Sequence, residues 1–146
     1  MADLMNNVEI DLGTVFEFAQ DISTQEAPPP LPPKTYVGEI TAAQAKRSPK
    51  GNIYIEVEWT IQPDQFPLDY AATQKDPQKL FYRRLVVSPD SDRNRYNLRK
   101  FSEAIRAVAS KRIDINDWVG KVANLKVKAT KYMGEDRAEI DAVEMV

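Results

Sequence analysis

Basic and aromatic side chains gather in three short stretches of this chain. Residues 46–50 hold three cations, residues 82–84 place a tyrosine before two arginines, and residues 131–137 again combine a tyrosine with cations. Lys and Arg bind phosphate groups, and an aromatic face can stack on the flat ring of a base. These stretches are the candidates for chemistry, and the elements that carry them decide whether they meet.

Cysteine and histidine are both absent from the 146 residues. Thiolate and imidazole zinc sites, cysteine nucleophiles, Ser-His triads and histidine general bases are excluded with them. We therefore predict that the protein is not an enzyme and that it carries no cofactor and no metal.

Four aspartates keep one catalytic alternative open. Carboxylates can bind Mg²⁺ in a metal-dependent nuclease, and the candidates are Asp90, Asp92, Asp114 and Asp117. A nuclease usually needs three or more converging acids, whereas the neighbours of these aspartates are typical of helix N-caps and turns. Capping and turn roles are the interpretation that we favour.

Charge is divided unevenly along the chain, whose formal net charge is −2. The first 33 residues contain six acidic residues and no Lys or Arg. The remainder holds all 20 basic residues against 16 of the 22 acidic ones, a net charge of +4. A mildly basic body behind an acidic segment is compatible with a nucleic-acid partner.

The central element of the expected fold is a strand over residues 52–61. Its apolar residues alternate with polar ones, which predicts one buried face and one face in water; they are Ile53, Ile55, Val57, Trp59 and Ile61. Further strands are expected at residues 35–43, 79–87, 121–132 and 137–146, with a hairpin turn at 133–136. Residues 62–79 are expected to form a long loop that is functional or mobile.

One helix is expected from N-cap residues at 88–92 to about residue 111. Its apolar stripe must lie on the sheet and consists of Leu98, Phe101, Ile105 and Val108. A neighbouring stripe, typical of a solvated flank, carries Arg95, Arg99 and Arg106. Trp118, in the connector that follows, is expected to plug the end of a barrel.

Residues 1–34 are predicted to be an acidic arm and a proline-rich spacer in front of a domain at residues 35–146. The arm is expected to be extended, with room for one helical turn, and its apolar residues are Val8, Ile10, Leu12, Val15, Phe16, Phe18 and Ile22. Residues 27–34 are expected to form a stiff polyproline II connector. An alternative is a ligand for an SH3-type groove, using Pro29, Pro32 and Lys34.

The expected elements run in the order strand, strand, strand, helix, strand, strand. That is the order of the OB-fold, a partly open barrel that binds oligonucleotides through strands two and three and two rim loops. We therefore predict a mainly β, five-stranded OB-like barrel with one α-helix between strands three and four, preceded by an extended N-terminal arm.

Four motifs carry a family resemblance. They are Leu-Pro-Pro-Lys-Thr-Tyr-Val-Gly-Glu-Ile at 31–40, Ser-Pro-Lys-Gly-Asn-Ile-Tyr-Ile-Glu-Val-Glu-Trp at 48–59, the helix at 98–108, and Trp-Val-Gly-Lys at 118–121. Together they resemble a phage and prophage family of small OB-like proteins from recombination and replication gene clusters. The resemblance implies sequence-tolerant single-stranded DNA binding in the host cytoplasm, with replication or recombination proteins as possible partners. Unlike bacterial single-strand-binding proteins, the chain has no glycine-rich linker and no acidic C-terminal tip, and its acidic segment is N-terminal.

An OB-like domain would bring the basic and aromatic stretches to one groove. The candidate residues are Lys46, Arg47 and Lys50 at the first rim, Tyr54 and Tyr82 as base-stacking rings, Arg83, Arg84, Lys126 and Lys128 as phosphate contacts, and Lys131, Tyr132 and Arg137 at the second rim. Glu56 and Glu58 share the polar face with Tyr54. They would repel phosphate unless Arg83 or Arg84 pairs with them.

A virion accessory or structural protein is the alternative function, with the arm making subunit contacts. For the arm itself we keep three hypotheses: it competes with phosphate, it is exchanged within a homo-oligomer, or it has no effect. No signal-peptide pattern and no run of 18 apolar residues occurs, so we expect no membrane segment.

Overall fold

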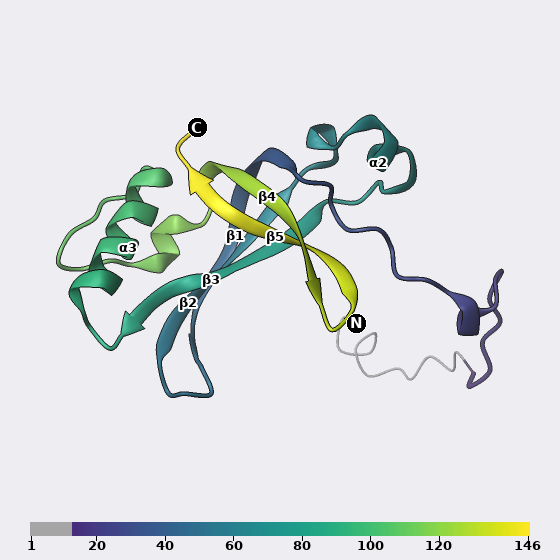
Figure 1. Ribbon diagram of the computed structural model, residues 1–146, viewed down its shortest axis with the longest axis horizontal. Coiled ribbons are helices and arrows are strands. Elements are labelled where there is room, and N and C mark those ends of the chain that lie inside the picture. Colours follow the sequence, from purple (N-terminus) through teal and green to yellow (C-terminus); the bar gives the residue numbers. More distant parts are fainter. Residues whose placement is uncertain (1–12) are drawn as a thin grey trace, which may run out of the picture.

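The structure is a computed structural model that describes residues 13–146 (Figure 1). Within them a five-stranded antiparallel sheet is formed by β1 (Lys34–Arg47), β2 (Ile53–Ile61), β3 (Gln78–Ser88), β4 (Val122–Tyr132) and β5 (Glu135–Glu144). The prediction of a mainly β, five-stranded protein is therefore confirmed. Val8, Ile10 and Leu12 of the expected arm lie outside the described residues.

The strands are ordered β3-β2-β1-β4-β5, so β3 and β5 are the two edges. No hydrogen-bonded ladder joins these edges, and the sheet is not closed into a barrel. One side chain spans the gap: Arg84 of β3 donates hydrogen bonds to the carbonyl oxygen of Asp141 and to the Glu139 carboxylate of β5. The curled sheet thus brings its edges close without pairing them.

Strand β2 has the alternation that its sequence predicts. Ile55, Val57 and Trp59 are buried on the face that packs into the core. The opposite face is drier than expected, because Glu56 and Thr60 are also buried. The prediction that this face is exposed to water is wrong for these two residues. Lys46 of β1 and Arg83 of β3 contact Glu56, and Thr41 of β1 contacts Thr60.

Helix α3 (Asp92–Ala104) follows β3 and supplies the ring at the centre of the core. Phe101 lies 6.2 Å from the ring of Trp59, 5.1 Å from that of Trp118 and 5.6 Å from that of Tyr82, between ring centroids. Trp118 belongs to the 3-10 helix η3 (Ile115–Trp118) and is fully buried. This aromatic cluster fixes the helix to the sheet.

The helix ends earlier than its sequence pattern predicts. The amide of Ala107 bonds to the carbonyl of Ser102 and that of Arg106 to Glu103, while Arg106 has a φ of 59°. These are the bonds of a Schellman motif, which normally uses glycine at the left-handed position. Val108 is consequently outside the helix and 81% exposed, so its expected place on the apolar stripe is wrong.

Residues 62–79 are not the open loop that we expected. They contain the 3-10 helix η2 (Pro63–Gln65) and the short helix α2 (Leu68–Thr73), so the domain has a second α-helix. Phe66 and Tyr70 are buried and meet edge to face, with centroids 5.1 Å apart. The two rings explain the order in this connection, because each buries a large apolar area.

The N-terminal part separates into an anchored spacer and an exposed arm. Leu31 is buried in the core, the hydroxyl of Tyr36 donates to the carbonyl of Pro32 at 2.6 Å, and Lys34 donates to the carbonyl of Gln65. Residues 31–34 of the spacer are therefore anchored to their own domain, as expected of a connector, while Pro29 is exposed. Before it, the described arm residues are exposed and include one helical turn, η1 (Ile22–Thr24). No helix in residues 13–146 is long and apolar enough to cross a membrane.

Replacing Gly38 tests the packing under β1. An added Cβ would lie 2.5 Å from Cδ1 and 3.2 Å from Cγ of Leu125, so this fully buried side chain would have to shift. We expect Gly38→Ala to lower the free energy of unfolding by about 1–3 kcal/mol, as overpacking does. Urea unfolding measures the change. In a Leu125→Ala background the same substitution should cost much less, and an equal cost in both backgrounds would contradict this contact.

Candidate nucleic-acid interface

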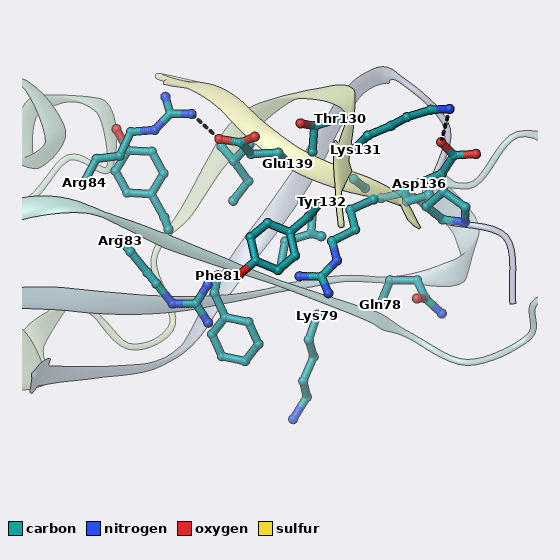
Figure 2. A pocket seen from close by; sticks show the side chains of 17 residues that line it. Gln78, Lys79, Phe81, Arg83, Arg84, Thr130, Lys131, Tyr132, Asp136 and Glu139 are labelled. Carbon is teal, nitrogen blue, oxygen red and sulfur yellow. Dashed lines mark hydrogen bonds and ion pairs between the residues drawn. The ribbon is translucent and has the colours of Figure 1, made fainter. Parts of the chain in front are cut away.

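A pocket of about 560 Å³ occupies the gap between β3 and the β4–β5 hairpin (Figure 2). The hairpin turns through two residues, Met133 and Gly134, with φ of 51° and 83°. Positive φ at both positions is the geometry of a type I′ turn, which keeps the two strands paired to their tip. The pocket is lined by Pro30, Leu31, Gln78, Lys79, Leu80, Phe81, Tyr82, Arg83, Arg84, Thr130, Lys131, Tyr132, Asp136, Arg137, Ala138, Glu139 and Ile140.

Two exposed aromatic rings line the pocket. Phe81 of β3 is 42% exposed and Tyr132 of β4 is 56% exposed. The Arg83 guanidinium lies 5.0 Å from the centroid of the Phe81 ring, and the Arg137 guanidinium lies 4.6 Å from that of Tyr132. Figure 2 shows Tyr132 pointing into the pocket toward β3. Each of the two accessible rings thus has a cation beside it.

Tyr54 and Tyr82 do not share a surface. Tyr82 is opposite Val57 in the β2–β3 ladder, and its ring stacks on Phe101 at an interplanar angle of 21°. Burial raises the pKa of the Tyr82 hydroxyl, and the nearby Arg84 opposes this only in part. Tyr54 is on the other face of β2, so the expectation of two stacking rings on one sheet face is wrong.

Sequence reasoning missed Phe81. It stands opposite Glu58 and therefore faces away from the core. Leu80, Phe81 and Tyr82 are three large apolar residues in succession, so the sequence does not show which of them faces the core. In the structure the burial alternates from Gln78 to Arg83 and is interrupted only by the register shift at Arg83 and Arg84. The useful signal was the partner strand: a residue paired with an outward glutamate must itself point outward.

Glu56 connects the first rim to β3 through ion pairs. Its carboxylate is buried and accepts from Nε of Arg83 at 2.7 Å, with Nζ of Lys46 at 3.0 Å. Burial would raise the pKa of Glu56, but the hydrogen bonds and charges of Arg83 and Lys46 outweigh it and hold the pKa below its usual value. The condition under which Glu56 would not repel phosphate, a pair with Arg83 or Arg84, is therefore met by Arg83.

Glu58 is neutralised in a different way. Thr41 donates a hydrogen bond to its carboxylate at 2.8 Å, and Lys79 lies 3.3 Å away. The Thr41 hydrogen bond is the main reason that the pKa of Glu58 is lowered. The two glutamates on this face are thus both compensated, and their repulsion of phosphate is correspondingly reduced.

The first-rim cations have different surroundings. The first strand, expected at residues 35–43, is longer in the structure, since β1 extends to Arg47. Lys46 is engaged with Glu56, whereas Arg47 donates to the carbonyl of Gly51 and Lys50 has no ion pair among the described residues. None of the three lines the pocket, and neither does Tyr54.

The remaining candidate cations lie on β4, on β5 and on the pocket wall. Lys126 has no ion pair within residues 13–146, and Lys128 lies 3.4 Å from Asp141; both are outside the pocket lining. Inside it, Lys131 lies 3.8 Å from Asp136, and Arg137 lies 3.7 Å from Glu135. Exposed pairs of this kind contribute little stability, so a phosphate can replace the carboxylate at small cost.

The aspartates of the nuclease alternative have structural contacts. Asp90 and Asp92 both pair with Arg95, and Asp114 accepts from the amide of Asn116. Across residues 13–146, no group of three or more acidic side chains is placed to hold a metal ion.

The ion pairs of Glu56 predict a pH-dependent stability difference. Because its folded-state pKa is below the ordinary value of 4.5, the charged carboxylate stabilises the fold above that pH, and this contribution is lost as the pH falls. Glu56→Gln should therefore be less stable than the wild type at neutral pH, with a gap that shrinks below pH 4.5. Urea unfolding across this range measures the gap. Glu39→Gln, an exposed site on the same sheet, controls for net charge, and a constant gap for Glu56→Gln would refute the role of its ion pairs.

Comparison with known proteins adds no family. No protein-family model matches the chain, and no curated protein matches it. The resemblance to phage single-strand-binding proteins therefore depends on the motifs of the chain itself. What the protein binds has to be inferred from the shape, rings and charges of its surface.

Proposed function

We propose that this protein binds single-stranded DNA, with little sequence preference, in the pocket between β3 and the β4–β5 hairpin. The observation that carries the proposal is the pair of exposed rings, Phe81 and Tyr132, which both line that pocket and each have a guanidinium beside them. Unpaired bases offer flat faces to aromatic rings, and their phosphates attract the neighbouring cations. The proposed function uses both properties at the same place.

The charge of the pocket supports a polyanionic ligand. Five basic side chains line it, and each of them is ion-paired with a carboxylate. The pairs of Lys131 and Arg137 are exposed, so these two cations can exchange their carboxylate for a phosphate. Stacking on a ring is tolerant of sequence, because every base has such a face. A duplex keeps its bases stacked on each other, so the rings favour a single strand.

The arrangement of elements supports an OB-like reading. The order β3-β2-β1-β4-β5, with β3 and β5 facing each other across a gap, is what results when a five-stranded partly open barrel is left unpaired at its closure. Helix α3 stands in the chain between β3 and β4. In this OB-like interpretation, Arg47 and Lys50 belong to one rim loop and the turn at Met133 forms the other. Lys126 and Lys128 would contact further phosphates of the bound strand.

The biological setting follows from the family resemblance. A sequence-tolerant single-strand binder without catalytic chemistry would protect and present DNA during phage replication or recombination. We place this activity in the host cytoplasm, alongside replication or recombination proteins. A virion role would also use the exposed arm, but it gives no reason for the rings and cations of the pocket.

Fluorescence anisotropy with labelled oligonucleotides tests the proposal directly. We expect the wild type to bind single strands of different sequence with similar affinity, to bind duplex less tightly, and to weaken as salt is raised. Equal affinity for single strand and duplex, or no binding at low salt, would overturn it.

The two rings give the sharpest variants. Phe81→Ala and Tyr132→Ala should each weaken single-strand binding by about 1–3 kcal/mol, since each removes one stacking surface. The salt dependence should change little, because no cation is removed. Tyr96→Ala is the matched control, an exposed ring on α3 outside the pocket. If both pocket variants unfold like the wild type and bind single strands with unchanged affinity, Phe81 and Tyr132 do not stack on the bases, and the proposed binding site is wrong.

The first rim can be tested without disturbing Glu56. The double variant Arg47→Ala/Lys50→Ala leaves the Lys46–Glu56 ion pair in place. It should lower the slope of log affinity against log salt by about 1.4, at roughly 0.7 per phosphate contact on a single strand. Lys111→Ala/Arg112→Ala removes the same charge from the exposed connection after α3 and should leave the slope unchanged. Equal slopes for the two double variants would exclude the rim from the binding path.

A further inference from the structure

The described arm, residues 13–26, displays large apolar side chains with no cover from its own body. Val15, Phe16, Phe18 and Ile22 are each more than half exposed. Phe16 and Phe18 are two residues apart, so an extended chain directs both to the same side. Such a concentration of exposed aromatic surface is typical of a segment that binds another surface.

The arm is also acidic throughout. Residues 13–26 contain Glu17, Asp21 and Glu26 and no basic residue. A segment that combines aromatic rings with regularly spaced negative charge offers the same two kinds of group as a single strand of DNA. It therefore suits a surface that presents rings and cations together.

The pocket between β3 and the β4–β5 hairpin is such a surface, and the arm starts from its border. Pro30 and Leu31, where the arm joins the body, line the same pocket as Phe81 and Tyr132. The arm carries three negative charges, and Lys131 and Arg137 of the pocket have only exposed ion pairs that an arm carboxylate can replace. Strand β3 is a sheet edge, so its backbone can also pair with an extended peptide.

The direction of the arm favours a second molecule. Five of the six residues at 28–33 are proline, which holds this segment extended and opposes a tight reversal. In Figure 1 the described arm runs away from the sheet instead of folding back over it. Residues 13–26, if fully extended at about 3.3 Å per residue, reach roughly 45 Å, which is enough to cross to a neighbouring domain.

We propose that residues 13–26 of one copy bind in the pocket of a second copy, with Phe16 and Phe18 against the Phe81 and Tyr132 rings. The acidic side chains then lie beside the pocket cations, among them Lys131 and Arg137. Exchange in both directions gives a dimer. Because the pocket is the one assigned to single-stranded DNA, the regulatory part of this inference rests on the proposed function: DNA and the partner's arm exclude each other.

Sedimentation equilibrium without nucleic acid tests the association. We expect the wild type to reach twice the chain mass of 16.6 kDa. Phe16→Ser/Phe18→Ser should raise the dissociation constant by about tenfold to a hundredfold per phenylalanine, the cost of losing one buried ring. Leu68→Ser/Tyr96→Ser removes two exposed apolar side chains elsewhere and should associate as the wild type does. A wild type with the mass of one chain at all concentrations, or an arm variant that associates normally, would overturn the proposal.

A mixing experiment separates exchange from binding within one chain. Phe16→Ser/Phe18→Ser keeps an intact pocket, and Tyr132→Ala/Arg137→Ala keeps an intact arm. Each should be monomeric alone, and the mixture should form a heterodimer with one arm bound. If the arm binds its own pocket, mixing produces no heterodimer, and the proposed second copy is refuted.

Adding a single-stranded oligonucleotide tests the competition. The measurement is made at low salt and at a protein concentration at which the wild type is a dimer. Under these conditions Phe16→Ser/Phe18→Ser, the arm variant, should bind the oligonucleotide at least about tenfold more tightly than the wild type does. Arm-dependent association with no DNA binding by any variant would refute the proposed function and leave arm exchange standing. Equal DNA affinity in wild type and arm variant, with association lost only in the variant, would refute the shared pocket.

Discussion

The sheet in this protein brings its two edge strands together without pairing them, and the candidate site depends on that constraint. Arg84 spans the gap by donating to Glu139 and to the carbonyl of Asp141. Had the ladder closed from β3 to β5, backbone hydrogen bonds would fill the space now lined by Phe81 and Tyr132. Because its hydrogen bonds join the two unpaired edges, Arg84 has a structural role.

The apolar framework of the fold was predictable because local pattern and tertiary packing agree in it. The alternation around Ile55 and Val57 identified β2, and the spacing of Leu98 and Phe101 identified a helix that packs on the sheet. Where a local irregularity interrupts the pattern, sequence reasoning failed. The succession of Leu80, Phe81 and Tyr82 concealed that Phe81 faces outward and Tyr82 inward. The left-handed Arg106 ended the helix without the glycine that usually marks such an end.

Contacts between residues far apart in the sequence also limited the prediction of the site. Nothing near Glu56 in the sequence indicates that its carboxylate is buried, because the covering groups come from β1 and β3. Lys46 and Arg83 looked like free phosphate ligands for the same reason. The basic stretches were correctly identified as unusual, but their cations divide into those that neutralise internal carboxylates and those, such as Lys50, with no ion pair in the part of the chain that the structure describes.

This division explains how a protein with a net charge of −2 can offer a site for a polyanion. Six of its negative charges are confined to the first 33 residues, and much of the remaining acidity is held in ion pairs on the sheet.

Binding in the proposed pocket combines two interactions, ring stacking and contacts between cations and phosphate, whose strengths respond differently to salt. Ring stacking persists at high ionic strength, while contacts between cations and phosphate weaken. An arm that carries both aromatic rings and carboxylates meets the same pair of terms, so salt weakens the proposed ligand and its proposed competitor together. Their balance would therefore depend mainly on the rings, which makes Phe81 and Tyr132 the residues that decide which ligand the pocket holds.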